Sequence, residues 1–174
     1  MDFSLPQAYL IGLIVLLGSA AVVVARQILR VRRDEAALAR LEAEVQGGQR
    51  SAADLYELAS VQLRKRLYSQ AADNLKQALK RAGNEPLEAQ ALIENALGFA
   101  LAAQNNYAAA VRHYRAALKA KADYPVALNN LAFALEKQQK QEEAREAYTK
   151  VLELDGANRT ARKRLKRLER RTAA

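Results

Sequence analysis

The stretch LGFALAAQNNYAAAVRHY, residues 97–114, returns thirty-four residues later as LAFALEKQQKQEEAREAY, residues 131–148. Leu, a small residue and Phe stand near the start of both copies, and Ala and Tyr recur near their ends. Both copies are rich in Ala and Leu, which are among the best helix formers. The chain therefore repeats a helical pattern of small, apolar and aromatic residues.

A period of 34 residues in a helical chain is typical of tetratricopeptide repeats, in which each unit is a pair of antiparallel helices. Small residues at Gly98 and Ala132 would let the two helices of a pair approach closely. Tyr114 and Tyr148 would fill the wider space toward the next pair. We expect these positions to form the core.

The pattern predicts three repeats, the smallest number that is usually stable. The first copy is offset by 39 residues, and we place its five extra residues around 83–88. The predicted repeats are 52–85, 91–124 and 125–158. Residues 159–174 should form a basic capping helix and tail, in which Leu165 and Leu168 cover the last repeat.

Charge is concentrated at the two ends of the chain. The 174 residues carry a net charge of +9, of which 34–158 contribute −1 and 159–171 contribute +7. The sequence contains no Cys, which excludes a disulfide framework and a cysteine nucleophile. With few Pro and Gly and abundant Ala and Leu, the composition predicts an all-α protein.

Residues 3–25 carry no charge and predict a transmembrane helix. A helix of 23 residues is roughly 34 Å long, which is enough to cross a bilayer core of about 30 Å. Four arginines follow it, so the positive-inside rule places the remaining chain in the cytoplasm or its organellar equivalent. A cleaved secretory signal and a buried soluble helix are the alternatives.

Residues 26–50 predict a juxtamembrane stalk and linker. Leu38, Leu41 and Val45 share one helical face, and Gly47 and Gly48 would end the helix. The apolar stripe is short, which favours a spacer over a dimerising coiled coil.

The sequence offers little support for catalysis. His113 is the only histidine, and we expect it to face solvent. No Gly-rich phosphate loop and no nucleophile with a base at a meaningful spacing is present. We therefore expect no enzyme activity, no cofactor and no metal site.

The first helices of stacked repeats line a groove, which is the expected binding surface for an extended peptide. Asn95 and Asn129 would bond the peptide backbone, whereas Phe99 and Phe133 would either contact the peptide or complete the inter-repeat core. The predicted groove residues are Tyr56, Ser60, Arg64, Asn95, Phe99, Ala103, Val126, Asn129, Asn130, Phe133 and Lys137.

Chaperone-binding repeat domains hold a C-terminal carboxylate with Lys, Arg and Asn at fixed groove positions. That clamp is absent from this sequence. The corresponding positions hold Tyr56, Ser60, Ala96, Val126 and Asn130.

The basic segment RTARKRLKRLERR, residues 159–171, has three interpretations. It could be the solvated face of a cap, or it could contact anionic lipid headgroups. Nucleic-acid binding is the least favoured, because no aromatic residue is interleaved for base stacking. The residues expected to contact lipid or another polyanion are Arg162, Lys163, Arg164, Lys166, Arg167 and Arg170.

Several features together resemble a known family. They are the apolar opening SLPQAYLIGLIVLLG, the exit ARQILRVRR, the short stalk and the three repeats ending near residue 158. This combination resembles the membrane-anchored tetratricopeptide proteins of cyanobacteria and plastids that assist photosystem I assembly. The resemblance implies a single-pass thylakoid protein with a cytoplasmic or stromal repeat domain that binds photosystem I subunits or assembly intermediates.

Two other functions remain open from the sequence. One is an anchored repeat scaffold in a bacterial plasma membrane, serving envelope biogenesis or protein quality control. The other is a ribosome or RNA tether acting through the basic tail.

Overall fold

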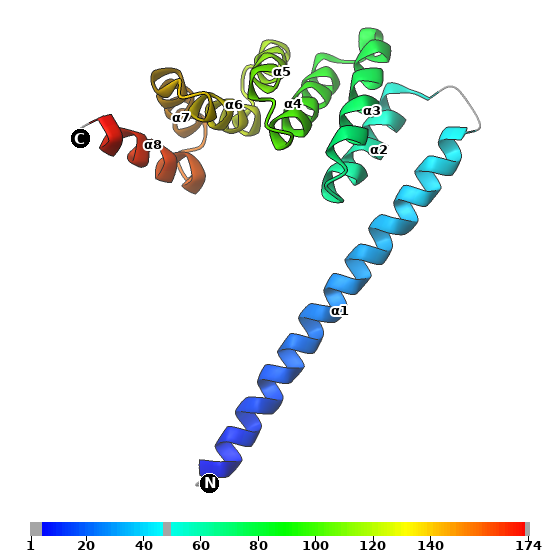
Figure 1. The fold of residues 1–174 in the computed structure, drawn as a ribbon, viewed down its shortest axis with the longest axis vertical. Coiled ribbons are helices and arrows are strands. Elements are labelled where there is room, and N and C mark those ends of the chain that lie inside the picture. Colours follow the sequence, from blue (N-terminus) through cyan, green and yellow to red (C-terminus); the bar gives the residue numbers. More distant parts are fainter. Residues whose placement is uncertain (1–4, 47–49, 173–174) are drawn as a thin grey trace. The chain divides into compact units, whose positions relative to one another are not determined.

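The computed structural model describes residues 5–46 and 50–172, and all the regular secondary structure within them is helical. This confirms the predicted all-α fold, with a long apolar helix followed by a repeat array (Figure 1). Phe3, Ser4 and the expected helix end at Gly47 and Gly48 lie outside the described residues.

The first helix, α1 (Leu5–Gln46), is continuous over 42 residues. It therefore runs through both the expected membrane segment and the expected stalk, and at 1.5 Å per residue it is about 63 Å long. Its apolar side chains are exposed, as at Leu16 (64%) and Val23 (66%). Within the described residues it is the one helix that is long and apolar enough to cross a membrane. The side chains of Leu41 and Val45 lie outside the description.

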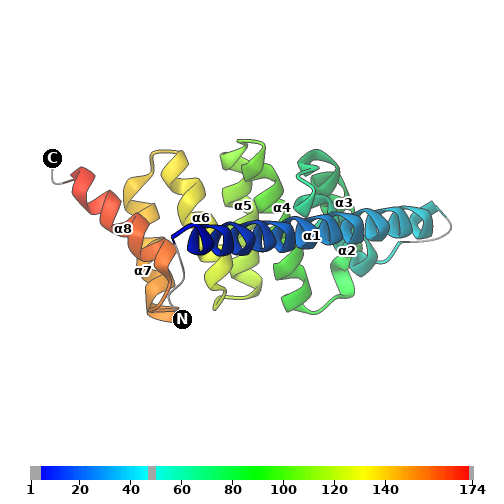
Figure 2. The ribbon, with the colours of Figure 1, turned by 90° about the horizontal axis from the view of Figure 1, so that it is seen from below.

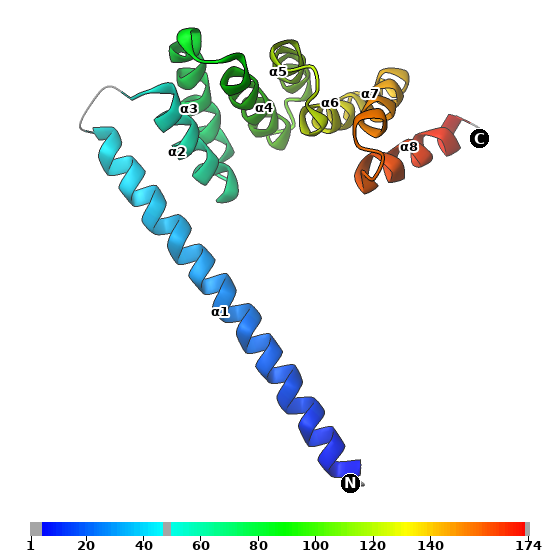
Figure 3. The ribbon, with the colours of Figure 1, turned by 180° about the vertical axis from the view of Figure 1, so that it is seen from behind.

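Residues 45–174 form a separate compact unit built from helix pairs. Successive pairs stand side by side in chain order, with a last helix at the end of the row (Figures 1, 2 and 3). The pairs are α2 (Ala52–Arg64) with α3 (Tyr68–Arg81), α4 (Leu87–Ala103) with α5 (Tyr107–Ala120), and α6 (Pro125–Lys137) with α7 (Gln141–Leu154), followed by α8 (Arg159–Thr172).

The turn inside each pair has the same backbone conformation. Arg66, Asn105 and Gln139 adopt positive φ angles of 62°, 62° and 63°. In the third pair the N–H of Lys140 then donates to the carbonyl of Leu135 at 3.0 Å, and equivalent bonds close the other two turns. A left-handed residue followed by this bond is a Schellman motif, which satisfies the last carbonyls of the first helix.

The five extra residues of the first period lie mainly in α4. This helix has 17 residues, compared with 13 in α6, so it begins four residues earlier in its repeat. The connection before it, which includes the 3-10 turn Ala82–Asn84, supplies the remaining residue. The sequence pattern placed the insertion in the connection, but periodicity alone does not distinguish a longer loop from an earlier helix start.

The repeat core is built from small residues against aromatic rings. Tyr114 and Tyr148 are 1% and 0% exposed. A Cβ added to Gly98 would lie 2.7 Å from Cε1 of Tyr114, so the ring fills the space that a larger residue would need. Ala132 occupies the equivalent position in the third pair and is fully buried. The small and aromatic positions of the repeat therefore have a steric cause.

The last helix, α8, covers the end of the array. Ala161 and Leu168 are fully buried, and Leu165 packs against the same cluster. Asn158 begins the helix, since its Oδ1 accepts a hydrogen bond from the N–H of Ala161 at 3.1 Å.

Candidate functional site

The first helices of the three pairs adjoin one another. α4 contacts α2 on one side and α6 on the other, so side chains at equivalent repeat positions follow one another from helix to helix. All eleven predicted groove residues belong to these three helices. We call the face that carries them the first-helix surface.

A chain of hydrogen bonds crosses the middle of the first-helix surface. The Nδ2 group of Asn95 donates to the hydroxyl of Tyr124 at 3.3 Å, and Nδ2 of Asn130 donates to Oδ1 of Asn95 at 3.0 Å. Burial raises the pKa of Tyr124, the charge interaction with Tyr56 raises it further, and the hydrogen bond from Asn95 lowers it. Asn95 therefore links two repeats, and its amide is already engaged inside the protein.

Asn129 differs from Asn95, although the two occupy equivalent repeat positions. Its Oδ1 is buried and has no hydrogen-bond partner among the described residues. An unpaired buried acceptor is costly, and this oxygen has almost no accessible surface through which a ligand could reach it. The two equivalent asparagines therefore differ in hydrogen bonding: Asn95 bonds Tyr124 and Asn130, whereas Asn129 keeps an unpaired oxygen.

Two phenylalanines occupy equivalent positions on α4 and α6. Phe99 is 44% exposed, and its ring meets Tyr68 edge to face, with ring centres 6.4 Å apart. Phe133 meets Tyr107 in the same way at 6.4 Å but is half-buried, and so is less exposed than Phe99. Each ring contacts the preceding repeat and also leaves part of its surface exposed to solvent. The rings therefore contribute to the inter-repeat packing and remain accessible on the first-helix surface.

The α2 end of the surface is less available. The hydroxyl of Ser60 donates to the carbonyl of Tyr56 at 2.8 Å, and Arg64 reaches the carbonyl of Ser60 at 3.4 Å. The side chains of Ser60 and Arg64 therefore bond backbone carbonyls of their own helix, and Tyr56 is half-buried.

The remaining predicted groove residues are open to solvent. Ala103, Val126 and Lys137 are all exposed, Val126 by 55%. The sequence analysis missed Leu92, which lies one repeat before Val126 and is 42% exposed. The 34-residue offset would have identified it, since 92 and 126 are equivalent positions.

A charged cluster joins α6 to α8. The carboxylate of Glu136, on a side chain only 9% exposed, pairs with Arg164 at 3.0 Å and also with Arg167. Tyr148 donates its hydroxyl to the same carboxylate at 3.3 Å. Burial alone would raise the pKa of Glu136, but the two guanidinium groups outweigh it and hold the pKa below its ordinary value. Sequence reasoning did not anticipate Glu136.

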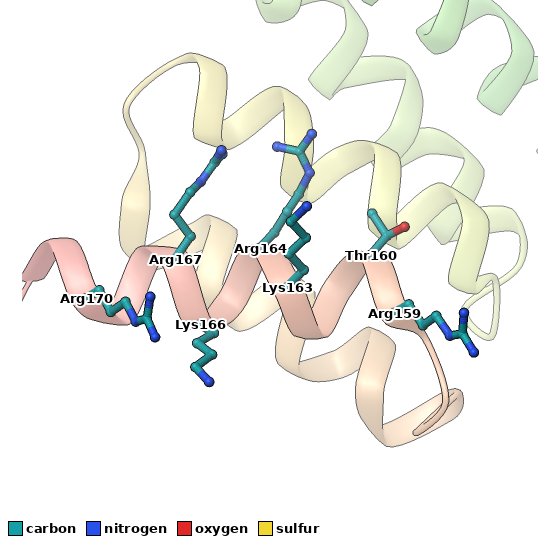
Figure 4. Close-up of a pocket in the computed structure, with 7 residues that line it drawn as sticks. All are labelled: Arg159, Thr160, Lys163, Arg164, Lys166, Arg167 and Arg170. Atoms are coloured by element: carbon teal, nitrogen blue, oxygen red, sulfur yellow. The ribbon is translucent and has the colours of Figure 1, made fainter.

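The basic residues of α8 point in different directions. Arg164 and Arg167 extend toward α6, whereas Lys166 and Arg170 extend away from it (Figure 4). Arg164 also lies over the ring of Phe133, 4.6 Å from its centre. Of the six basic residues predicted from the sequence, all but Arg162 line one depression of about 740 Å³ along α8, although their side chains extend in more than one direction.

Two further features bear on chemistry other than binding: the residue types that could hold a metal, and His113. No cluster of three His, Asp or Glu that could hold a metal is found among the described residues. His113, expected to face solvent, is half-buried, and its Nδ1 lies 2.7 Å from Oε2 of Glu94. Its role is therefore a contact between α5 and α4.

Comparison with known proteins identifies the family. Residues 125–158 match the tetratricopeptide repeat model. The chain is 32% identical over 163 residues to the chloroplastic tetratricopeptide protein PYG7 of Arabidopsis thaliana, covering 94% of this chain and 54% of that one. It is 30% identical over 165 residues to the ycf37 protein of Guillardia theta, covering 95% of this chain and 93% of that one. The chain belongs to the ycf37 family of tetratricopeptide proteins.

The ycf37-family chain spans about half the length of the Arabidopsis relative. Among solved structures it is similar to the first tetratricopeptide domain of Spaghetti (RPAP3) bound to the HSP90 peptide SRMEEVD. That similarity has a TM-score of 0.66 at 22% identity and covers 71% of this chain and 94% of the other. At this identity the similarity concerns the fold alone, and Ala96, one of the positions compared with the chaperone clamp, is buried here.

Proposed function

We propose that this ycf37-family chain is a non-catalytic, membrane-tethered scaffold that binds photosystem I subunits or assembly intermediates. The observation that carries the proposal is the first-helix surface, where exposed apolar side chains alternate with polar groups. Leu92, Phe99 and Val126 are 42%, 44% and 55% exposed on adjacent helices. Exposed aromatic and aliphatic anchors beside amide groups suit the binding of an extended segment of another protein.

The N-terminal helix supplies the tether in this proposal. Its uncharged segment is followed by Arg26, Arg30, Arg32 and Arg33, which supports a single span with the repeats on the cytoplasmic or stromal side. Attachment to a membrane confines the repeat domain to a thin layer. Weak contacts with partners in the same membrane then become effective through a raised local concentration.

The photosynthetic setting rests on kinship. The Arabidopsis relative is a chloroplast protein, and the anchor, stalk and repeat order resemble the photosystem I assembly family. A thylakoid membrane is therefore the proposed location, with a bacterial plasma membrane as the alternative.

The test is affinity purification of the tagged full chain from detergent-solubilised thylakoids. We expect photosystem I subunits to copurify with the unaltered chain. The doubly substituted variant Phe99→Ala/Val126→Ala should lose most of them, because it removes two anchors from the first-helix surface.

A matched control removes an exposed leucine from a second helix. Leu154, on α7, is 41% exposed, and Leu154→Ala should recover the same subunits as the unaltered chain. Recovery of no photosystem I subunit by any form of the chain would contradict the proposal.

A further inference from the structure

The last helix follows the repeat register. α6 begins at Pro125 and α8 begins at Arg159, thirty-four residues later. The residues that end the preceding helices, Lys121 and Asp155, have nearly the same backbone angles, with φ of −143° and −140°. α8 is thus connected to α7 as α6 is connected to α5.

Packing agrees with this register. Ala161 and Leu168 are fully buried, as are Ala127 and Ala134 at the equivalent positions of α6. Leu165, like its equivalent Leu131, packs against the same hydrophobic cluster. α8 therefore occupies the place of the first helix of a fourth repeat, without its second helix.

This register assigns four α8 residues to positions of the first-helix surface. Counting 34 residues from each groove residue of α6 gives the α8 equivalents. They are Thr160 for Val126, Lys163 for Asn129, Arg164 for Asn130 and Arg167 for Phe133. The asparagine and phenylalanine positions of the third repeat are therefore all basic on α8.

The contacts confirm that these residues turn toward α6. Arg164 and Arg167 reach Glu136, and in Figure 4 Lys163 extends beside Arg164 while Lys166 points the other way. Lys163 makes no hydrogen bond or ion pair with any other residue in the described part of the chain. Arg164 donates one hydrogen bond to Glu136 and stacks on Phe133, and 30% of its side chain remains exposed.

We propose that α8 extends the first-helix surface and makes its end a binding site for an acidic peptide segment that also carries an apolar side chain. The inference rests on the proposed function and names the chemistry of the partner. Four cations, Lys137, Lys163, Arg164 and Arg167, border this end, and Glu136 neutralises only one charge. The apolar side chain would contact Phe133, and the acidic groups would meet the surrounding cations.

The shape of the site favours a peptide over a lipid surface. A depression of about 550 Å³ lies between α6 and α8, and Phe133, Glu136, Lys137, Gln139, Arg164 and Arg167 line it. A recess with an aromatic ring and a carboxylate in its wall suits a protruding side chain. A flat layer of headgroups would instead meet the basic residues that point away from α6, Lys166 and Arg170.

The test is a selection from a library of random twelve-residue peptides on the full chain in detergent. We expect the selected peptides to be enriched in Asp and Glu beside an apolar residue. Binding of the best peptide should weaken by about tenfold or more in Lys137→Gln/Arg167→Gln, because both cations line the depression and two charge-assisted contacts are lost. The matched control Lys166→Gln/Arg170→Gln has the same net charge and should bind within about twofold of the unaltered chain.

Three results would overturn the inference. They are a selection without acidic enrichment, an equal loss in both variants, and binding to phosphatidylglycerol vesicles that depends on Lys166 and Arg170 while no peptide is retained. The inference and the proposed function fail separately. If photosystem I subunits copurify with the chain and neither double variant changes their recovery, the scaffold stands and the acidic site does not.

Discussion

Phe99 and Phe133 occupy the same position in successive repeats and meet the same kind of partner, yet their surroundings differ. Phe99 is 44% exposed, and the following first helix offers Asn130 at the position where α8 offers Arg164 to Phe133. Arg164 and Lys137 lie 4.6 and 5.6 Å from the ring centre of Phe133. One repeat position is therefore a neutral apolar contact in the middle of the surface and part of a cationic site at its end.

The comparison shows that a groove residue is defined by the next first helix as well as by its own repeat. Because α8 keeps the register but not the composition of α6, it changes the environment of Phe133 without changing the fold.

Leu168→Ala should weaken the packing of α8, the helix whose Arg164 lies over the Phe133 ring, and so expose Phe133 to solvent as Phe99 is exposed. Leu168 is fully buried, so its truncation should destabilise the repeat unit by about 2–5 kcal/mol. Urea unfolding followed by circular dichroism measures the loss. Fluorine NMR of fluorophenylalanine-labelled chain should show greater solvent exposure at Phe133 and no change at Phe99. Leu154→Ala, at a site 41% exposed, should cost less than about 0.5 kcal/mol.

Glu136→Gln should remove the ionic link that distinguishes the Phe133 end. We expect a loss of about 1–3 kcal/mol at neutral pH, since hydrogen bonds to a charged group are lost. The pKa of Glu136 is lowered from 4.5 in the fold, so its stabilisation is present above that pH and is lost as the pH falls through the folded value.

Unfolding of both chains from pH 7 to pH 3 measures this difference. The gap in stability between the unaltered chain and the variant should narrow below about pH 4.5. A gap that stays constant with pH would mean that the carboxylate charge contributes nothing.

Gly98→Ala in the second repeat should have a different cause of destabilisation from the reverse change, Ala132→Gly, at the equivalent position of the third repeat. The new Cβ would meet the Tyr114 ring at 2.7 Å, and overpacking should outweigh the gain in helix propensity by about 1–2 kcal/mol. Adding Tyr114→Leu should relieve the clash, so the two changes together should cost less than their sum. Ala132→Gly should cost about 1–2 kcal/mol, because it lowers helix propensity and removes a buried methyl group. Urea unfolding of Gly98→Ala, Tyr114→Leu, their double variant and Ala132→Gly provides the comparison.

Gln139→Gly should stabilise the turn of the third pair slightly. Gln139 has a φ of 63°, which glycine adopts without a Cβ penalty, so we expect a gain of about 0.5–1 kcal/mol. Asn105→Gly, in the second pair, should gain less because Asn tolerates this conformation better. Equal gains, or a loss at Gln139, would show that the side chain stabilises the turn in some other way.

Much of the fold could be predicted from periodicity. Steric requirements repeat with the structure, so Gly98 with Tyr114 and Ala132 with Tyr148 revealed the helix pairs. The uncharged run before Arg26 revealed the long apolar helix, because length and composition determine that property. The earlier start of α4 could not be predicted, since the helix begins at Leu87, which does not belong to the repeat pattern.

The candidate site was less accessible to sequence reasoning. Most residues of the first-helix surface could be predicted from equivalent repeat positions. Their hydrogen-bond partners could not, because these depend on side-chain directions that the repeat period does not determine. Asn95 and Asn129 are equivalent in the sequence pattern, but Asn95 bonds the hydroxyl of Tyr124 whereas Asn129 has an unpaired oxygen. The basic tail read as one charged segment, and only packing against Glu136 shows which residues turn toward α6.

The central claim is that the first-helix surface is where this protein binds its partners. A photoreactive benzoylphenylalanine at position 99 or 133 of the full chain, irradiated in native thylakoids, tests it most directly by mass spectrometry of the adducts. Position 150, which is exposed on α7, provides the control. The account predicts adducts with photosystem I subunits from positions 99 and 133 and few from 150. Adducts from position 150 with none from the two phenylalanine positions would contradict it.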